Sequence, residues 1–267
     1  MCLIVFAYRV HPDFPLIVAA NRDEFHARPT ALAAWWADYP SVFAGRDLQG
    51  GGTWMGVTRA GRFAALTNAR SPAPKQTGDA PSRGLLVANF LTGEASPRGY
   101  AHTLAPQVDA YNGFNLLTAD FNVPTMPLVV WSPQSANIAP QALAPGVYGL
   151  SNAALNTPWP KLTRSVDTVR TILQAALQGS LPQEALLSRL FTVMADETQA
   201  PPSALPDTGL EPARERILSA AKIVDPTYGT RASTALLIGA DRQILVRERR
   251  FDVSGKQVGE ERVHFQM

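Results

Sequence analysis

The sequence has little of what disulfide-bonded, membrane-spanning or nucleic-acid-binding proteins need. It contains one cysteine in 267 residues, so no disulfide forms within the chain. The N-terminal apolar run CLIVFAY is far shorter than the roughly 20 residues of a membrane span and lacks the basic start of a signal peptide. Charged residues make up 17% and the formal net charge is +2, without a basic run, which argues against a nucleic-acid partner. We expect a cytoplasmic protein without an integral membrane segment.

Motifs for metals and nucleotides are also missing. The four histidines form neither HxxxH nor HExxH, and one cysteine is too few for a thiolate zinc site. GxGxxG, P-loop and GxSxG motifs are absent as well. We therefore expect no metal site, no nucleotide-binding fold and no serine nucleophile elbow. The histidines are His11, His26, His102 and His264.

Apolar runs predict strands near both ends of the chain and helices between them. Cys2–Val10 and Leu16–Asn21 flank the segment HPDFP and predict a hairpin, and Thr53–Arg59 with Arg62–Asn68 predict a second one. A helix beginning near Pro158 is predicted by apolar residues at helical spacing. The other predicted helices and strands are Ser82–Leu91, Gly99–Val108, Leu186–Met194 and Pro212–Ala221, then Phe114–Thr118, Met126–Trp131, Val147–Ser151, Ala232–Ile238, Gln243–Arg250 and Val258–Phe265.

This segregation of strands and helices favours an α+β fold over a doubly wound parallel sheet. Two segments rich in proline, glycine and small polar residues, Asn68–Gly84 and Glu197–Pro212, predict long surface loops. Neither segment separates regions of different composition. The sequence therefore predicts a single domain over residues 1–267.

The second predicted strand changes abruptly from apolar to charged residues in VAANRDEF. With a period of two, Asn21 and Asp23 share one face, and Arg22 and Glu24 share the other. A polar strand end is an ordinary feature by itself. The hairpin, however, brings this end close to the lone thiol of Cys2, which favours a functional interpretation.

Three further turns carry polar side chains at strand ends. Asn68 ends the strand before a long loop, Asn152 follows YGLS, and Arg231 precedes an apolar strand. Each is an ordinary turn signal when taken alone. Together they supply amide donors and a cation, which are the groups that stabilise a developing oxyanion.

Six blocks, in order along the chain, resemble the NRDE, or transport-and-Golgi-organisation, protein family. They are ANRDEF, GGTWMGVTRAGRFAALTN, SRGLLV, YNGFNLL, GLSNAALNTPWPK and YGTRASTALL. The resemblance runs from Cys2 to about Thr234 and implies ligand-binding positions at Asn21, Arg22 and Trp54.

More distantly, the layout is similar to the penicillin V acylase and bile-salt hydrolase group of N-terminal-nucleophile (Ntn) hydrolases. This resemblance implies an αββα sandwich of two antiparallel sheets between helical layers. It also implies catalytic roles for Cys2, Asp23, Asn68, Asn152 and Arg231. Cys2 is the nucleophile once Met1 is removed, and Asp23 holds its amine; the two asparagines donate to the oxyanion, and Arg231 favours the thiolate.

One position departs from the pattern of that group. Ala20 stands where the group has arginine before the shared asparagine, and the arginine of this chain is at position 22. By strand alternation, Arg22 faces away from Asp23 unless a bulge redirects it. The departure weakens the inference from acylase layout to acylase activity.

Three functions remain open from the sequence. The first is an N-terminal-cysteine amidohydrolase or acyltransferase that acts on an amide or thioester of a small apolar acyl compound and requires no cofactor. The alternative is a non-catalytic trafficking protein that binds haem, or a lipid or acyl-CoA, as the NRDE resemblance implies. The third is an inactive Ntn-like fold that serves as an interaction module. The sequence does not indicate the oligomeric state.

Overall fold

A computed structural model describes residues 2–70, 80–133, 139–179 and 181–267. These residues form two compact units. The first unit comprises residues Met1–Ala27, Pro145–Ser151 and Leu155–Phe265, and the second comprises Arg28–Ala144, Asn152–Ala154 and Gln266–Met267. Each unit contains one antiparallel sheet and its own helices. The single domain expected over residues 1–267 stays a prediction.

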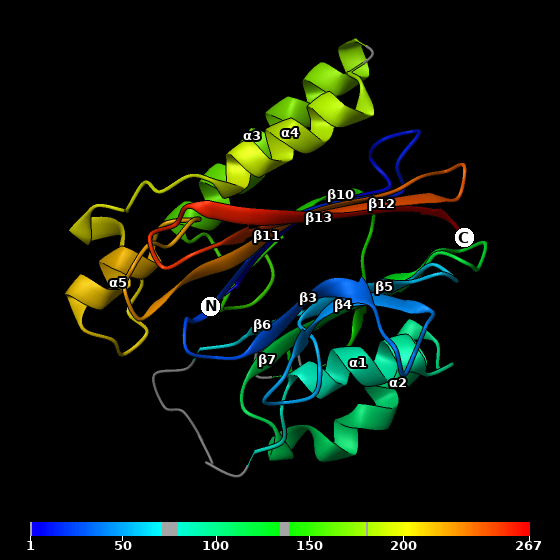
Figure 1. The fold of residues 1–267 in the computed structure, drawn as a ribbon, viewed down its shortest axis with the longest axis horizontal. Helices are drawn as coiled ribbons and strands as arrows, with labels where there is room; N and C mark the ends of the chain where they lie inside the picture. Colours follow the sequence, from blue (N-terminus) through cyan, green and yellow to red (C-terminus); the bar gives the residue numbers. More distant parts are fainter. Residues whose placement is uncertain (1, 71–79, 134–138, 180) are drawn as a thin grey trace. The chain divides into compact units, whose positions relative to one another are not determined.

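The sheet of the first unit has six strands in the order β10-β1-β2-β11-β12-β13. Its central strands β1, β2 and β11 lie side by side (Figure 1), although β11 follows β2 by about 200 residues in the chain. The predicted first hairpin and the predicted C-terminal meander are both confirmed within this sheet. The strands are β1 (Cys2–Tyr8), β2 (Leu16–Phe25), β10 (Gly146–Leu150), β11 (Tyr228–Ile238), β12 (Gln243–Phe251) and β13 (Gln257–Gln266).

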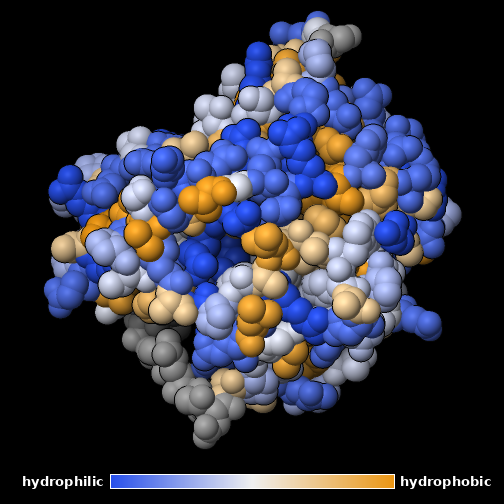
Figure 2. All heavy atoms as spheres, viewed as in Figure 1, coloured by the Kyte–Doolittle hydropathy of each residue, from blue (hydrophilic) through white to orange (hydrophobic). Residues whose placement is uncertain are grey.

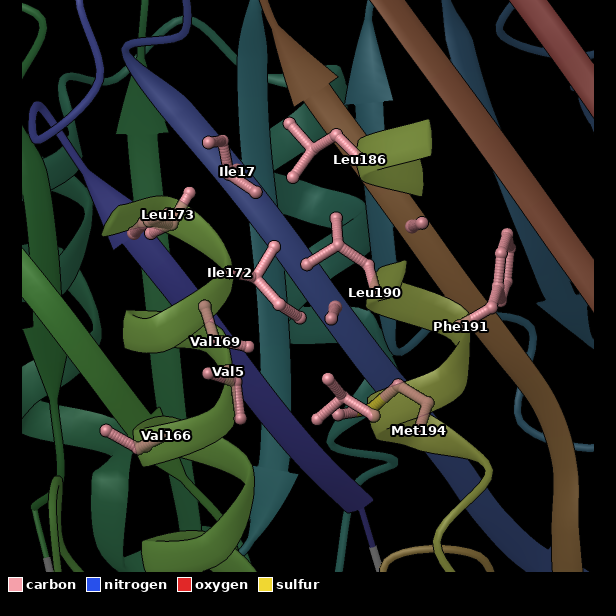
Figure 3. Packing of buried hydrophobic residues seen from close by; sticks show 14 of the residues in the cluster. Val5, Ile17, Val166, Val169, Ile172, Leu173, Leu186, Leu190, Phe191 and Met194 are labelled. Carbon is pink, nitrogen blue, oxygen red and sulfur yellow. The ribbon is translucent and has the colours of Figure 1, made fainter. Parts of the chain in front are cut away.

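Helices α3 (Pro160–Gln178) and α4 (Gln183–Met194) cover one face of this sheet, and α5 (Pro212–Leu218) follows them in the chain. Figure 3 shows Val166, Val169 and Leu173 of α3 over Val5, with α4 alongside. Odd-numbered residues of β1 and β2 supply the strand side of this core, because successive side chains of a strand alternate between its faces. Even-numbered residues, Cys2 included, therefore occupy the opposite face.

The second unit contains a seven-stranded antiparallel sheet in the order β3-β4-β5-β6-β7-β8-β9. Helices α1 and α2 pack against this sheet (Figure 1) around Phe90, Tyr100 and Phe114. The strands are β3 (Thr30–Trp35), β4 (Val42–Asp47), β5 (Met55–Thr58), β6 (Arg62–Asn68), β7 (Phe114–Asp120), β8 (Leu128–Trp131) and β9 (Gln141–Ala142). The helices are α1 (Gly84–Thr92), α2 (Pro97–Leu104) and the 3-10 helix η1 (Ala105–Ala110).

Strands β3 and β4 have no counterpart among the sequence predictions. Their segment, TALAAWWADYPSVFAGRD, is rich in alanine, which has low strand propensity, and it contains no long β-branched run. Pairing with β5 and a cation–π contact hold the region together. The guanidinium of Arg59 lies over the ring of Trp35, 3.7 Å from its centroid. Tertiary contacts therefore override local propensity here.

The two predicted surface loops fare differently. Glu197–Pro212 contains one 3-10 turn, η2 (Pro202–Ala204), before α5 begins. Most of Asn68–Gly84 lies outside the described residues, since these omit 71–79.

Apolar surface is scattered among polar surface on the face that Figure 2 presents. Exposed apolar side chains such as Phe25, Leu48 and Val253 come from separate parts of the chain. Within the described residues, every helix is too short or too polar to cross a bilayer.

Candidate functional site

The β1–β2 register places Cys2 directly opposite Arg22. Directly opposed residues of an antiparallel pair share one face, so the thiol and the guanidinium lie on the same side of the sheet. Arg22 Nη2 is 3.7 Å from Glu24 Oε2, which places Glu24 on that side too. The predicted alternation within Asn21–Glu24 is thus confirmed. It turns Arg22 away from Asp23 and toward Cys2, so the departure from the acylase pattern leaves an arginine on the face of the thiol.

Asp23 is buried on the opposite, helix-facing side of β2. The Thr230 hydroxyl donates to Asp23 Oδ1 at 2.6 Å and accepts the backbone N–H of Ile223 at 2.9 Å. The Tyr228 hydroxyl donates to the backbone oxygen of Asp23 at 3.0 Å. Asp23 is therefore fixed by side chains from β11, which neighbours β2 in the sheet.

Asn21 shares the helix-facing side with Asp23 and is fully buried. Its amide Nδ2 donates to the backbone oxygens of Met194 and Ala221, both at 2.8 Å, and its Oδ1 accepts from the Ser233 hydroxyl at 2.5 Å. These contacts join β2 to the end of α4, to the segment after α5 and to β11. The bonds give Asn21 a structural role at the site, and its predicted ligand-binding role stays a prediction.

Arg231 is the extra residue of a β-bulge. The register pairs Thr230 with Asp23 and Ala232 with Arg22, which leaves Arg231 without an opposite residue on β2. Bulges re-aim side chains, and the Arg231 guanidinium donates to the backbone oxygens of Phe25 and His26 at 3.0 and 3.1 Å. Its predicted action on the thiolate stays a prediction.

Gly229 is needed where β11 approaches the segment after α5. A Cβ at this position would lie 2.8 Å from the backbone oxygen of Ile223, which is too close for a non-glycine residue. The backbone N–H of Thr230 donates to that same oxygen at 2.9 Å. Within YGTR, Tyr228 and Thr230 therefore donate hydrogen bonds to Asp23. Gly229 allows the close contact with Ile223, and Arg231 occupies the bulge.

Burial raises the pKa of the Cys2 thiol above its ordinary value, and the charge of Asp23 raises it further. The positive charge of the N-terminal amine, a hydrogen bond from the Asp23 backbone N–H and the charge of Arg22 lower this pKa, without reversing the effect of burial. Cys2 is therefore a neutral thiol near pH 7, and a base has to remove its proton before it acts as a nucleophile.

Burial also raises the pKa of the Asp23 carboxyl. The positive charge of the N-terminal amine opposes that rise most, followed by the charge of Lys161, the hydrogen bond from Thr230 and the charge of Arg22. Burial outweighs these groups, so the pKa of Asp23 stays above its ordinary value.

Three residues at this end of the sheet were missed at the level of sequence. The Ser151 hydroxyl donates to the backbone oxygen of Cys2 at 3.1 Å and links the end of β10 to β1. Thr230 holds Asp23, and Lys161 is a buried lysine at the start of α3. Each lies inside one of the six blocks named above, and Lys161 carried a signal, since a lysine there falls within the buried stripe of the predicted helix.

The remaining predicted site residues lie in the second unit. Asn152 Nδ2 donates to the backbone oxygen of Asn68 at 2.7 Å, and the backbone N–H of Arg70 donates to the oxygen of Asn152 at 2.7 Å. Trp54 is half-buried, and its backbone oxygen accepts from Leu66 at 2.8 Å. The structure thus brings Asn68 and Asn152 together, while their predicted catalytic role and the predicted binding role of Trp54 stay predictions.

The Trp54 block is shaped by a close backbone contact. A Cβ on Gly52 would lie 2.2 Å from the carbonyl carbon of Gly84, so this position admits only glycine without displacement. The backbone N–H of Thr53 donates to the oxygen of Gly84 at 3.1 Å. This contact links the GGTW and SRGLLV blocks, which are about 30 residues apart in the chain.

Metal ligands do not cluster in the described part of the chain, where no group of three or more His, Cys, Asp or Glu side chains is placed to hold an ion. The ring Nε2 of His26 is engaged with the backbone oxygen of Asp225 at 3.0 Å. The described side chains at this end of the first unit's sheet include a thiol, two carboxyl groups and guanidinium groups.

The sequence matches the protein family described as Transport and Golgi organisation 2 over residues 1–253. It is 38% identical over 260 residues to the Transport and Golgi organization protein 2 homolog of Bos taurus, covering 93% of this chain and 92% of that protein. The homolog of Homo sapiens is 35% identical over 261 residues, with 93% and 92% covered.

Among solved structures, a mutant of the conjugated bile acid hydrolase from Clostridium perfringens is similar to this chain. The TM-score is 0.50 at 8% sequence identity, covering 100% of this chain and 97% of that chain. At this identity the likeness concerns the fold alone. The predicted α+β fold of the Ntn-hydrolase type, with two antiparallel sheets, is confirmed.

Proposed function

The chain belongs to the Transport and Golgi organisation 2 family, as its sequence blocks predict, and we propose that it is an N-terminal-cysteine hydrolase or acyltransferase. Its substrate is an amide or thioester of a small apolar acyl compound. Cys2 is the nucleophile, Asp23 orients the α-amine that removal of Met1 exposes, and Arg22 stabilises the thiolate. No cofactor takes part.

The observation that carries this proposal is the arrangement around the lone thiol. Cys2 lies opposite Arg22 on β2, and the next residue, Asp23, sends its backbone N–H to the sulfur. The carboxyl of Asp23 is held at 2.6 Å by Thr230. A buried carboxyl and a buried guanidinium are costly unless a function or a partner retains them. Packing alone requires neither group beside a cysteine.

The proposed reaction proceeds in two halves. The α-amine takes the thiol proton, and the thiolate attacks the substrate carbonyl carbon, forming a C–S bond. The tetrahedral intermediate collapses, the C–N bond of an amide or the C–S bond of a thioester breaks, and the leaving group takes the proton from the ammonium. Water then gives a proton to the amine and attacks the acyl-enzyme, which releases the carboxylic acid and the thiol. A second substrate nucleophile in place of water makes the reaction an acyl transfer.

The α-amine suits the role of base because its ordinary pKa of about 7.7 to 8.0 lies near the working pH. The raised pKa of the Cys2 thiol makes such a base necessary. Arg22 lowers the thiol pKa and thus favours the thiolate once the proton leaves. Asn68 and Asn152 remain sequence-based candidates for the oxyanion donors.

Two measurements on one sample test the proposal. Intact mass of protein from its native cells is expected to show that Met1 is removed, and acyl-thioester and β-lactam probes are expected to label the parent but not Cys2→Ala. Because Cys2 is the lone cysteine, any thioester adduct maps to it. If processed parent protein stays as unlabelled as Cys2→Ala, the nucleophile assignment is wrong.

A matched control separates the thiol from the amine. One residue inserted between Met1 and Cys2 keeps the thiol but holds its α-nitrogen in a peptide bond. The mechanism predicts loss of probe labelling in this variant. Labelling at the parent rate would show that the amine is not the base.

The non-catalytic alternative, a trafficking protein that binds haem or a lipid or acyl-CoA, stays a second proposal from the sequence. It predicts a saturable Soret shift with haemin, or saturable acyl-CoA binding, that is equal for the parent and for Cys2→Ala. For either function we propose a cytoplasmic location, because a lone functional thiol persists best in a reducing compartment.

A further inference from the structure

A three-residue stretch, Asn152–Ala154, belongs to the second unit, although the chain before and after it belongs to the first. Asn152, at its start, is fully buried. The Asn152 amide Nδ2 donates to the backbone oxygen of Asn68 at 2.7 Å, and the backbone oxygen of Asn152 accepts from the N–H of Arg70 at 2.7 Å. These two bonds attach the stretch to the end of β6 and to the residues that follow it.

Asn115 attaches the same stretch to β7. It is the second residue of that strand and is 1% exposed. Its amide Nδ2 donates to the backbone oxygen of Ala153 at 2.9 Å and to the hydroxyl oxygen of Thr67 at 3.0 Å. An amide nitrogen carries two hydrogens, and these two acceptors account for both. One hydrogen serves the sheet, since Thr67 lies directly opposite Asn115 on β6, and the other leaves the sheet for Ala153.

Asn115 and Thr67 lie on the face of the second unit's sheet that turns away from α1 and α2. The neighbours Phe114 and Leu116 pack with the helices, and successive side chains of a strand alternate between its faces. A buried amide is costly unless it is hydrogen-bonded. The bond to Thr67 satisfies one hydrogen within the sheet, so the second requires an acceptor outside the sheet, which Ala153 provides.

From these contacts we infer that Asn115 is a positioning residue for Asn152. By holding the backbone oxygen of Ala153, it fixes the residue that follows Asn152 and so keeps the Asn152 amide in one orientation. The anchoring of Ala153 stands on the contacts alone. Its catalytic consequence rests on the proposed function, in which Asn152 is a candidate donor to the oxyanion.

The expected consequence for catalysis follows from how an oxyanion donor works. One hydrogen of Asn152 Nδ2 goes to the oxygen of Asn68, and because an amide group is planar, this bond also sets the direction of the second hydrogen. A donor is effective when it lies about 2.7 to 3.1 Å from the oxyanion, and a misplacement of about 1 Å can cost about 100-fold in rate. Loss of Asn115 should therefore slow attack on a carbonyl group without changing the thiol of Cys2.

The first test compares two reactions of Cys2 in protein from which Met1 has been removed. Acylation by the acyl-thioester probe passes through a tetrahedral oxyanion, whereas alkylation by iodoacetamide displaces iodide from a saturated carbon and forms no oxyanion. We expect Asn115→Leu to slow acylation by about ten- to 100-fold and to leave the alkylation rate at that of the parent. If both rates fall by the same factor, or if acylation does not slow, the inference is overturned.

Thr67→Val is the matched control, because it removes the acceptor on β6 and leaves the bond from Asn115 to Ala153. We expect it to be acylated at the parent rate. The double variant Thr67→Val/Asn115→Leu replaces both partners of the cross-strand bond by apolar groups of similar shape, a change that can be nearly neutral for stability. It keeps the test decisive if Asn115→Leu folds poorly, and its acylation should be slow. Acylation of Thr67→Val as slow as that of the double variant would contradict a role through Ala153.

A second background tests whether Asn115 acts through Asn152. Asn152→Ala is expected to slow acylation by about 100- to 1,000-fold, the typical effect of losing one oxyanion donor. Substitutions within one hydrogen-bonded network are not additive, so Asn115→Leu should slow the Asn152→Ala protein little further. If it slows that protein by the same factor as it slows the parent, Asn115 does not act through Asn152 and the inference is wrong.

Amide hydrogen exchange tests the anchoring without the proposed reaction. The N–H of Arg70 donates to the oxygen of Asn152, so its protection reports whether the stretch stays in place. We expect this protection to fall by about two- to tenfold in Asn115→Leu, the factor that one net hydrogen bond contributes, and to stay at the parent value in Thr67→Val. Unchanged protection in Asn115→Leu would overturn the inference.

The two measurements separate the inference from the proposed function. If the protection of Arg70 falls as expected while the parent is never acylated, Asn115 anchors the stretch and the proposed hydrolase function fails. If the parent is acylated and the protection of Arg70 does not change in Asn115→Leu, the proposed function stands and the positioning role fails.

Discussion

The two faces of β2 differ in how their polar groups are held. On the helix-facing side, Asn21 and Asp23 are fixed by hydrogen bonds of 2.5 to 2.8 Å from and to α4, β11 and the segment after α5. On the face of the thiol, Arg22 and Glu24 form one ion pair at 3.7 Å. The first face is thus held by buried side-chain hydrogen bonds, and the second carries a charged pair beside the thiol.

Within Asn21–Glu24, the helix-facing side chains fix the position of the strand, whereas the side chains on the other face carry charge beside the thiol. Hydrogen bonds to buried backbone groups fix the path of β2, because each buried partner left unmade is costly. The register then fixes Cys2 opposite Arg22 without any bond between their side chains. Changes on the helix-facing side should therefore act on stability, and changes on the face of the thiol should act on its protonation.

The largest expected effect is that of Asn21→Leu. This change removes both donors to the oxygens of Met194 and Ala221 and the acceptor for Ser233, while nearly conserving volume. Each buried polar group left without its partner costs about 1 to 3 kcal/mol. We expect a loss of about 3 kcal/mol or more in the free energy of unfolding, measured by urea denaturation.

Arg22→Met is the matched control on the other face. The change removes one long ion pair, and the remaining partner Glu24 is partly exposed and can be hydrated, so it should cost less than Asn21→Leu in the same assay. Equal losses for Asn21→Leu and Arg22→Met would remove the distinction between the two faces.

Gly229→Ala is expected to have a smaller effect on the same frame. The added Cβ meets the backbone oxygen of Ile223 at 2.8 Å and displaces the strand that carries Thr230. Forced overpacking typically costs about 1 to 3 kcal/mol, and we expect about 2 kcal/mol in urea denaturation. Gly179→Ala is the control, because its added Cβ meets no atom within 4 Å among the described residues beyond its chain neighbours. A loss in Gly179→Ala as large as that in Gly229→Ala would show that contact with Ile223 is not the cause.

Sequence patterns predicted the structure around the site well where the pattern lies within one strand, hairpin or helix. The alternation in Asn21–Glu24 and the hairpin placed the charged residues beside Cys2, and the helical spacing of Leu162, Val166 and Val169 predicted α3. The alanine-rich β3 escaped prediction because its pairing partners, not its propensity, make it a strand. Local patterns therefore predict elements that bury one regular face.

The rest of the site could not be predicted because it depends on pairing between distant segments. The bulge at Arg231 exists only through the register of β11 against β2. The register of β1 against β2 likewise sets the neighbour of Arg22: strand alternation alone predicts that Arg22 points away from Asp23, but not that it lies opposite Cys2. Lys161 reaches Leu218 across 57 residues of sequence.

The smallest expected effect concerns the thiol itself. Burial raises the pKa of Cys2 and Arg22 opposes that rise, so Arg22→Met should raise this pKa further and lower the thiolate fraction at every pH below it. A shift of one unit is a tenfold change, or about 1.4 kcal/mol. The ultraviolet absorbance of the thiolate, with Cys2→Ser subtracted, reports the titration of the lone cysteine without requiring access by a reagent.

Glu24→Gln should change the pKa of the Cys2 thiol in the opposite direction to Arg22→Met. Loss of the Glu24 carboxylate removes the partner 3.7 Å from Arg22 and leaves the guanidinium charge to act on Cys2. The thiol pKa should then fall, by less than the rise in Arg22→Met, because Glu24 is farther along the strand from Cys2 than Arg22 is. If both variants titrate like the parent, Arg22 does not act on the thiol, and burial, the N-terminal amine and Asp23 set the pKa of Cys2.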